Sequence, residues 1–228
     1  MIYVDPSRWF EDHESENLAK IQIDNCFRLG VEKDIVLVTN FEYEYRGIKP
    51  IILGDETCCK FDIRASKIFV IVDLFDRNLI EDELYWIHDL DAYQLLPIEE
   101  DELGLGEKDL ALTDYGWRKK CNTGSFFFNR NSGDIFRDIM HFILENGGHE
   151  EGALDNLIKN NNNNIKDRYK MLNIRYNIGM SKLPYIVKKA IKPIKVLHFH
   201  PEKRDILSKF KPLMTEGLLE IFKIYGYN

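Results

Sequence analysis

The chain has 228 residues, of which 44% are hydrophobic and 30% are charged, and its formal net charge is -7. This composition is typical of a soluble globular protein long enough to bury one substantial core, so we expect one domain. An acidic chain is a poor candidate for sequence-independent binding of nucleic acid, because such binding relies on Lys and Arg side chains that neutralise phosphates.

No apolar segment of the sequence is suited to crossing a membrane. The longest uninterrupted apolar run is 68–72, whereas a membrane-spanning helix needs about 20 residues. The first residues, from Met1 to Asp5, lack the basic and then apolar segments of a secretory signal. The four cysteines show no zinc-ligand spacing, so reduced thiols are the simplest interpretation. We therefore expect a cytoplasmic protein.

The charge is unevenly distributed along the chain. Residues 1–164 contain 17 Lys and Arg against 33 Asp and Glu, whereas residues 165–228 contain 14 against 5. The basic C-terminal segment therefore indicates contact with an anionic partner, although simple segregation of solvated surface charge is an alternative.

The first half of the chain alternates short apolar runs with helical patterns. The helices are expected at 16–29, which Gly30 would terminate, and at 61–75. Short β-branched or aromatic runs predict strands at 2–4, 35–38, 50–53 and 84–87. This alternation favours an α/β fold with a mostly parallel central sheet flanked by helices.

The second half continues with strands and helices in a less regular order. The run 160–164 consists of asparagines and is expected to form a mobile loop. Strands are predicted at 110–113, 124–129, 171–178 and 196–200, and helices at 132–146, 151–159, 206–210 and 213–225.

An Asp-x-Asp motif follows the strand predicted at 84–87. Ligands of parallel sheets bind beyond the carboxyl ends of the strands, where His88, Asp89, Leu90 and Asp91 stand. Alternate residues of an extended chain point the same way, so both carboxylates are able to face one Mn²⁺ or Mg²⁺ ion. A solvated turn that contains this motif by chance is the alternative.

Three further segments carry polar residues at the ends of apolar runs. His198 and His200 alternate in a predicted strand, so both imidazoles are available on one face, although ordinary polar residues would also close a strand. Asn122, Thr123 and Gly124 precede an aromatic strand. Glu150 and Glu151 begin a helix, where the helix dipole alone also favours acids.

Taken in chain order, these motifs resemble those of the GT-A-fold glycosyltransferases that use nucleotide-diphosphate sugars, in a glycogenin-like arrangement. The resemblance extends over most of the chain, from Ile2 to Arg204. It implies a single GT-A-like, Rossmann-like domain over 1–228. Within it, 1–98 would be the nucleotide-sugar-binding half, and 99–228 the acceptor-binding half with the basic C-terminal segment.

The resemblance also implies roles for particular residues. Asp89 and Asp91 match the DxD motif that binds the metal and through it the donor diphosphate, and His198 matches a further metal ligand. The expected catalytic acids are Glu150 and Glu151, with Asp114 behind them. The residues expected to bind the nucleotide sugar are Tyr3, Asp5, Trp9, Arg64, Lys67, His88, Asp89, Leu90, Asp91, Lys203 and Arg204. Those expected to contact the acceptor or the sugar are Tyr115, Trp117, Asn122, Thr123, Gly124 and His200.

The sequence departs from the glycogenin-like pattern at two places. Pro201 replaces a Gly after the His-Phe segment, and Lys203 and Arg204 stand where the family has Lys-Pro-Trp. The acidic helix also reads Glu-Glu-Gly-Ala-Leu-Asp rather than Asp-Gln followed by an Asn-bearing turn. These departures leave open which cation reaches the diphosphate and whether transfer retains or inverts the anomeric centre.

The sequence therefore predicts a soluble, metal-dependent glycosyltransferase. Its substrates would be a UDP- or GDP-linked sugar and a hydroxyl group of a glycan or protein acceptor. A metal-dependent nucleotidyltransferase is an alternative, because such enzymes also use paired carboxylates on an α/β sheet. A second alternative is a non-catalytic, glycosyltransferase-like module that binds nucleotide or glycan.

Overall fold

The N-terminal segment forms a small parallel sheet in this computed structural model, which describes residues 2–4, 14–81 and 83–228. Its strands are β1 (Ile2–Val4), β2 (Leu37–Thr39) and β3 (Ile51–Ile52), paired in that order and all parallel. Helix α2 (Glu14–Leu29) connects β1 to β2. It ends at Gly30, whose φ of 73° is the left-handed conformation that commonly terminates helices.

The second sheet has four strands in the order β4-β7-β6-β8, and its central strand β7 is buried along its whole length. Strand β7 is antiparallel to both of its neighbours, whereas β6 and β8 are parallel. The four strands are β4 (Tyr85–His88), β6 (Leu110–Asp114), β7 (Cys121–Phe128) and β8 (Tyr169–Met171).

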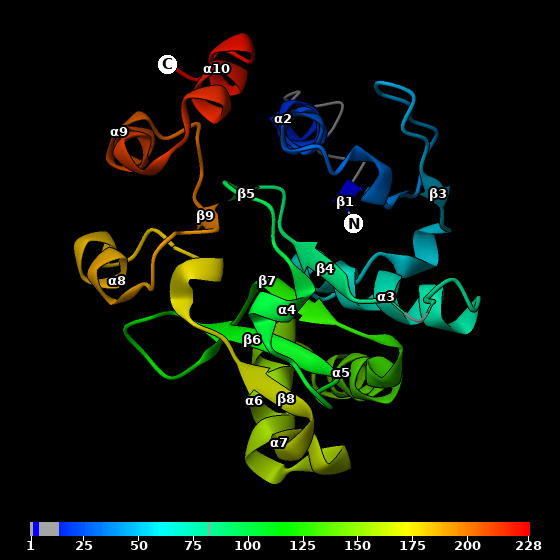
Figure 1. Cartoon of the computed structure of the whole chain (residues 1–228). Coiled ribbons are helices and arrows are strands. Elements are labelled where there is room, and N and C mark those ends of the chain that lie inside the picture. The colour runs from blue at the N-terminus through cyan, green and yellow to red at the C-terminus, as the bar shows by residue number, and fades with distance from the viewer. Residues whose placement is uncertain (1, 5–13, 82) are drawn as a thin grey trace.

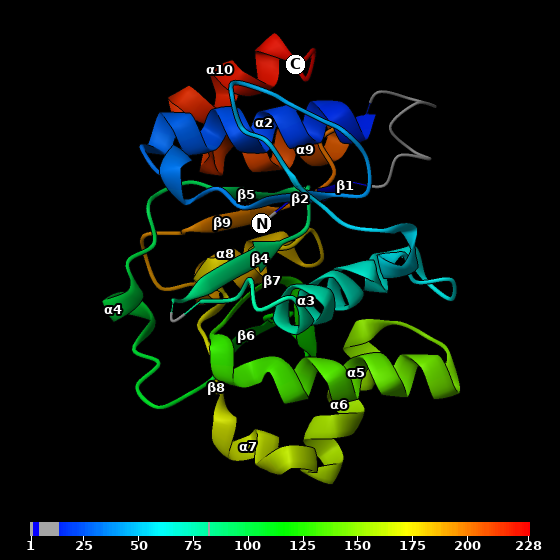
Figure 2. The ribbon, with the colours of Figure 1, turned by 90° about the vertical axis from the view of Figure 1, so that its right-hand side faces the viewer.

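Helices cover both outer sides of these sheets (Figure 2). Below the four-stranded sheet lie α3 (Ser66–Asp76), α5 (Gly133–Asn146) and α6 (Glu150–Asn160), whose apolar residues share one core with Phe126 and Phe128 of β7. The two shortest helices are α4 (Glu100–Leu103) and α7 (Ile165–Arg168). This arrangement confirms the predicted α/β fold with parallel strands and flanking helices, but the four-stranded sheet is mixed rather than mostly parallel, because β7 is antiparallel to both of its neighbours.

The C-terminal segment returns to the N-terminal helix (Figures 1 and 2). Strand β9 (Val196–His198) pairs antiparallel with β5 (Ala92–Gln94), and α10 (Glu216–Ile224) lies beside α2. The remaining helices are α8 (Leu183–Lys189) and α9 (Arg204–Phe210). Tyr93, Phe199, Phe210 and Phe222 are fully buried in the core of this region, which therefore holds β9 against β5.

Several predicted elements differ from the structure, including the expected loop at 160–164, where α6 ends at Asn160 and a 3₁₀ turn spans Asn162–Asn164. Strand β8 ends at Met171, and Ile174–Tyr176 form a 3₁₀ turn rather than the predicted strand, because the side chain of Asn173 accepts a hydrogen bond from the Arg175 amide and caps that turn. Strand β7 begins at Cys121, so Asn122–Gly124 lie within it, and Cys121 and Asn122 pair with the end of β6. Phe61, which we expected to begin a helix, is 58% exposed and precedes α3. No helix in the described ranges is long and apolar enough to cross a membrane.

Candidate active site

The Asp-x-Asp motif forms a turn between β4 and β5 that is held by backbone hydrogen bonds from distant parts of the chain. The amide of Asp89 donates to the carbonyl of Gly124 on β7 at 2.9 Å. The amide of Phe199, directly after β9, donates to the carbonyl of Asp91 at 2.9 Å. The positions of both aspartates therefore depend on the strands that pack around the turn.

Helix α2 holds the same turn from its other side. The Nε2 group of the buried Gln22 donates to the carbonyls of Leu90 at 2.8 Å and Ala92 at 2.9 Å. These two carbonyls flank Asp91 in the chain. The side-chain amide of Gln22 thus supplies a hydrogen-bond donor to the carbonyl groups on both sides of Asp91, which limits the motion of the Asp91 backbone.

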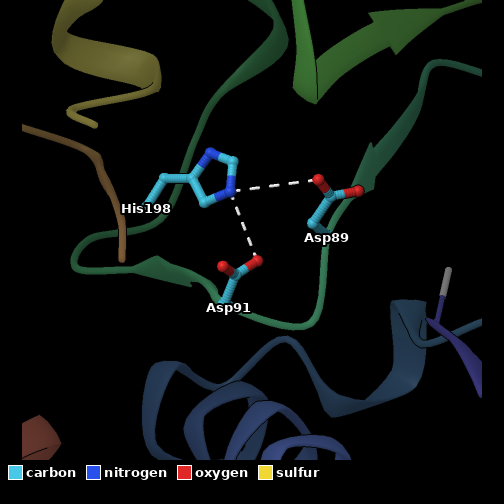
Figure 3. Close-up of side chains that lie close together, drawn as sticks. All are labelled: Asp89, Asp91 and His198. Carbon is cyan, nitrogen blue, oxygen red and sulfur yellow. Dashed lines mark ion pairs between the residues drawn. The ribbon is translucent and has the colours of Figure 1, made fainter. Parts of the chain in front are cut away.

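His198 meets the two aspartates through the pairing of β5 with β9. Its Nε2 atom lies 3.2 Å from Oδ1 of Asp91 and 3.9 Å from Oδ2 of Asp89. Figure 3 shows the three side chains pointing toward one another, and one ligand atom from each lies within 4.8 Å of the others. The structure therefore brings together the three residues that the sequence suggested as metal ligands.

The donor set fits a divalent metal ion. Nδ2 of Asn177 donates to Oγ1 of Thr113 at 3.0 Å, so Oδ1 of Asn177 is the acceptor for Nδ1 of His198, also at 3.0 Å. The Nε2 lone pair of His198 therefore faces the carboxylates, as in many metal sites. Two carboxylates and one imidazole together form a donor set that suits Mn²⁺ or Mg²⁺.

The charges of the cluster are strongly coupled. Burial disfavours the protonated form of His198, but the carboxylates of Asp91 and Asp89 outweigh this effect and raise the pKa of His198. Burial also disfavours the ionised form of Asp91, but the imidazoles of His198 and His200 lower its pKa. The site thus favours a positive charge between the aspartates.

Gly124 leaves the space that His198 occupies. A Cβ atom at this position would lie 2.6 Å from Nδ1 of His198 and closer still to Cε1, which no ordinary packing permits. The absence of a side chain on β7 therefore allows the imidazole to approach the strand.

Lys67 at the start of α3 connects the metal-ligand cluster to one of the predicted catalytic acids. Its buried Nζ lies 2.6 Å from Oδ1 of Asp89 and 3.1 Å from Oε1 of Glu150, and it donates to the carbonyl of Thr123 at 3.0 Å. Burial opposes its charge, but the two carboxylates outweigh that effect and raise the pKa of Lys67. Lys67 is therefore a fixed cation that holds Asp89 and Glu150 in place.

A cavity of about 490 Å³ opens beside this cluster. Its wall includes many of the residues that the sequence suggested: Arg64, Asp89, Tyr115, Trp117, Asn122, Thr123, Gly124, Glu150, Glu151, His198 and His200. It also includes residues that sequence reasoning missed: Arg118, Lys120, His149, Asn177, Gly179, Met180 and Ser181. Arg118 and Lys120 follow Trp117 closely in the sequence, and His149 precedes Glu150 and Glu151, so their positions beside predicted site residues could have indicated them. No local sequence pattern indicates Asn177.

The two neighbouring acids have different surroundings. Oε1 of Glu150 accepts from Oγ1 of Thr123 at 2.9 Å, while its Oε2 is buried without a hydrogen-bond partner in the described part of the chain. Burial opposes ionisation of Glu150, but Lys67 lowers its pKa below the ordinary value. Glu151 instead accepts a hydrogen bond of 2.7 Å from the hydroxyl of Tyr115. Burial and Glu151 raise the pKa of Tyr115 to about 12, so this hydroxyl stays protonated and donates.

Several predicted site residues lie away from the cavity wall. His88 stacks on Trp86 with ring centroids 4.2 Å apart, and burial lowers the pKa of His88 to about 3, so its ring is neutral. Leu90 packs into the apolar core, and Oδ1 of Asp114 accepts from the Gly116 amide at 2.6 Å.

The other predicted nucleotide-sugar residues lie at the two ends of the chain. Lys203 and Arg204 are exposed at the start of α9 and do not line the cavity. The backbone of Tyr3 lies in β1, but the description does not include its side chain. Asp5 and Trp9 lie outside the described residues. Proposed roles for these positions stay predictions.

The structure is similar to several solved glycosyltransferases. An active-site mutant of LgtC aligns with a TM-score of 0.61 at 13% identity, over 99% of this chain and 94% of LgtC. The galactosyltransferase LgtC in complex with donor and acceptor sugar analogues aligns with a TM-score of 0.58 at 13% identity, over 96% and 98% of the two chains.

Two further glycosyltransferases align over most of the chain. One is involved in glycosylation of the major capsid of PBCV-1, with a TM-score of 0.52 at 14% identity, over 90% of this chain and 95% of that one. The other is GlyE of Streptococcus pneumoniae TIGR4, with a TM-score of 0.58 at 16% identity, over 91% of this chain and 60% of GlyE. No model of a protein family and no curated protein matches the sequence. The likeness therefore shows that the chain has the GT-A fold.

Proposed function

We propose that this protein is a metal-dependent glycosyltransferase that moves a sugar from a UDP- or GDP-linked donor to a hydroxyl group of a glycan or protein. The observation that carries the proposal is the convergence of Asp89, Asp91 and His198 beside a 490 Å³ cavity in a chain with the GT-A fold. A nucleotide-diphosphate sugar fits this site because its diphosphate is the kind of group that a carboxylate-held metal ion binds.

In this proposal Asp89, Asp91 and His198 hold a Mn²⁺ or Mg²⁺ ion. When bound, such an ion neutralises negative charge on the departing nucleoside diphosphate. The surrounding residues act by fixing the ligands: Gln22 holds the turn, Asn177 orients the imidazole and Lys67 anchors Asp89. The ligands are thus held in place before the donor binds, which limits the reorganisation that the reaction requires.

Glu150 and Glu151 are the acids available on the sugar and acceptor side. Inverting transfer requires a carboxylate that accepts the proton of the acceptor hydroxyl, whereas retaining transfer does not require a base at that position. Glu150 is the better placed of the two, because it lines the cavity and Lys67 ties it to Asp89. We assign it to binding and orienting the reacting hydroxyl. Asp114 has no part in this proposal, because it bonds Gly116 and does not line the cavity.

The test is turnover of UDP- and GDP-linked sugars by the purified chain with Mn²⁺, measured as release of nucleoside diphosphate. Asp91→Asn keeps the shape of the side chain but weakens a ligand, so we expect turnover to fall at least about 100-fold, beyond the usual loss for residues that only support a ligand. The matched control is Asp101→Asn, an exposed position on α4 that does not line the cavity.

The outcomes separate the competing functions. Release of pyrophosphate would indicate a nucleotidyltransferase, and metal-dependent binding of UDP or GDP without turnover would indicate a non-catalytic module. Full turnover by Asp91→Asn, or in the presence of a chelator, would show that the metal role is wrong.

A further inference from the structure

Two cations cover the aromatic rings at the rim of the cavity. The guanidinium carbon of Arg118 lies 4.0 Å from the ring centroid of Tyr115 and 5.0 Å from that of Trp117. Nζ of Lys182 lies 4.8 Å from the ring centroid of Trp117. We call Tyr115, Trp117, Arg118 and Lys182 the cation–aromatic cluster. Because cations occupy positions over these rings, the cluster presents positive charge to a ligand as well as a surface for stacking a sugar.

The two cations of the cluster have no acidic partner in the described part of the chain. Neither Arg118 nor Lys182 forms an ion pair with a carboxylate there, whereas the neighbouring Lys120 lies 3.4 Å from Glu151 and 3.9 Å from Asp155. Arg118 is exposed and also lines the cavity. The aromatic rings therefore position these cations without neutralising them.

The cluster lies at the far end of a series of contacts that begins at the metal-ligand residues. Lys67 joins Asp89 to Glu150, and Thr123 donates to Glu150 through its hydroxyl. The amide of Thr123 donates to Glu151 at 3.4 Å, and Glu151 accepts from Tyr115. The two acids thus separate the cation–aromatic cluster from Asp89. A ligand in the cavity that contacts Tyr115 would therefore lie beside Glu151, to which Tyr115 donates.

We propose that the cation–aromatic cluster selects an anionic acceptor, namely a saccharide that carries a carboxylate, sulfate or phosphate group near the accepting hydroxyl. This inference rests on the proposed function and specifies its acceptor class. The planar guanidinium of Arg118 suits bidentate hydrogen bonds to such a group, and the ammonium of Lys182 adds a second charge. A neutral sugar would leave both cations without a partner.

Matched acceptors test this preference directly. Methyl glucoside and methyl glucuronide differ only in a hydroxymethyl group against a carboxylate, and glucose 6-sulfate and glucose 6-phosphate distinguish the other two anions. With the full chain, Mn²⁺ and the donor that supports turnover, we expect kcat/KM to be about tenfold or more higher for at least one anionic acceptor, mainly through KM. The preference should shrink as salt is raised, because the cluster is solvent-accessible.

The variants Arg118→Gln and Lys182→Gln assign the preference to the cluster. Each should lower the ratio of kcat/KM for the anionic to the neutral acceptor toward 1, a readout that a general loss of activity would not change. Lys119→Gln is the control, because Lys119 is an exposed neighbour in the same loop that, among the described contacts, does not lie over the rings of Tyr115 or Trp117. Equal use of all acceptors, or a rise in KM for the donor alone in Arg118→Gln, overturns the inference.

Binding without a donor separates this inference from the proposed function. Ligand-detected NMR with the same sugars should show binding of an anionic sugar in preference to the neutral one, and Arg118→Gln should remove the difference. If no nucleotide sugar is turned over but this preference is present, the proposed function fails while the anionic site stands. If binding shows no preference, the inference fails whatever the turnover.

Discussion

At the scale of single residues, the metal-ligand cluster depends on neighbours that are not ligands themselves. Gly124 leaves room for the imidazole of His198, and Asn177 orients it. Gln22 bonds the two carbonyls that flank Asp91. Such supporting contacts usually change metal affinity by about 10–100-fold when they are lost.

Gly124→Ala should weaken Mn²⁺ binding by about tenfold or more, because the added Cβ would overlap the ring of His198 and force it out of position. Mn²⁺ affinity measured by electron paramagnetic resonance tests this. Gly152→Ala is the control: a Cβ there, in the first turn of α6, meets only His149, at 3.8 Å, so metal binding should be unchanged and stability slightly higher. Unchanged Mn²⁺ affinity in Gly124→Ala would contradict the predicted overlap.

Gln22→Met should lower both stability and Mn²⁺ affinity. It leaves the buried carbonyls of Leu90 and Ala92 without a donor, at a cost of about 1–3 kcal/mol, and it loosens the turn that carries Asp91. Gln94→Met is the control, because Gln94 is also buried and donates to the carbonyl of Leu96, away from the metal ligands. Unfolding by urea and titration with Mn²⁺ should show that both variants are less stable but that only Gln22→Met binds the metal more weakly. If Gln22→Met and Gln94→Met bound Mn²⁺ with equal affinity, the role of Gln22 would be structural only.

At the scale of elements, Arg168 joins the C-terminal end of α7 to α5 and to the segment before β6. Its guanidinium lies 2.7 Å from Asp109 and 2.6 Å from Asp134, and it donates to the carbonyl of Asn131 at 2.7 Å. Asp109 is buried, so the arginine is the partner that permits its carboxylate to lie there. This one side chain therefore adds to the pairing of β8 with β6 in fixing the C-terminal end of α7.

Arg168→Met should lower the free energy of unfolding by about 1–3 kcal/mol, since it leaves polar groups without partners. The hydrogen bond from Arg168 lowers the pKa of Asp134, so this pair stabilises the fold above the ordinary aspartate pKa of about 3.9. That contribution is lost as pH falls through the pKa of the folded state, so the difference between wild type and variant should narrow in acid, leaving the part due to the Asn131 carbonyl. Arg137→Met, in an exposed pair with Asp76, should cost at most about 0.5 kcal/mol. Melting temperatures between pH 3 and 8 test both; a difference that persists unchanged in acid would exclude this pairing as the cause.

At the scale of the whole molecule, the site is built from both halves of the chain. Asp89 and Asp91 belong to the predicted half 1–98 and His198 to the predicted half 99–228, and β5 pairs with β9 between them. The division into a donor half and an acceptor half stays a prediction.

The uneven charge of the chain did not predict which cations line the cavity. The basic C-terminal segment indicated Lys203 and Arg204, which are exposed away from the cavity wall. The cations in the wall are Arg64, Arg118 and Lys120, all from the acidic part of the chain. The net charge of a segment does not indicate in which direction a loop projects each of its side chains.

Most helices and strands were predictable because each has a regular apolar pattern of its own. Helices α2, α5 and α6 lie within a few residues of their predicted bounds. Strand β5 (Ala92–Gln94) was missed because it is short and buried on both faces, so it shows no alternation. The strand expected at 171–178 failed because Asn173 caps a 3₁₀ turn inside an apolar run.

The sequence by itself determined the chemistry available at the site. Asp89 and Asp91 follow a strand and His198 lies in one, as the apolar runs predict, but the Asp-x-Asp segment forms a turn rather than extended chain, and β9 stops at His198. Only the tertiary structure decided that these residues meet, since the pairing of β5 with β9 is held by a core of aromatic side chains from distant segments. It also decided that Gln22, Lys67 and Asn177 support them and that Arg118 reaches the cavity. These contacts join residues far apart in the chain, and local propensity carries no information about such partners.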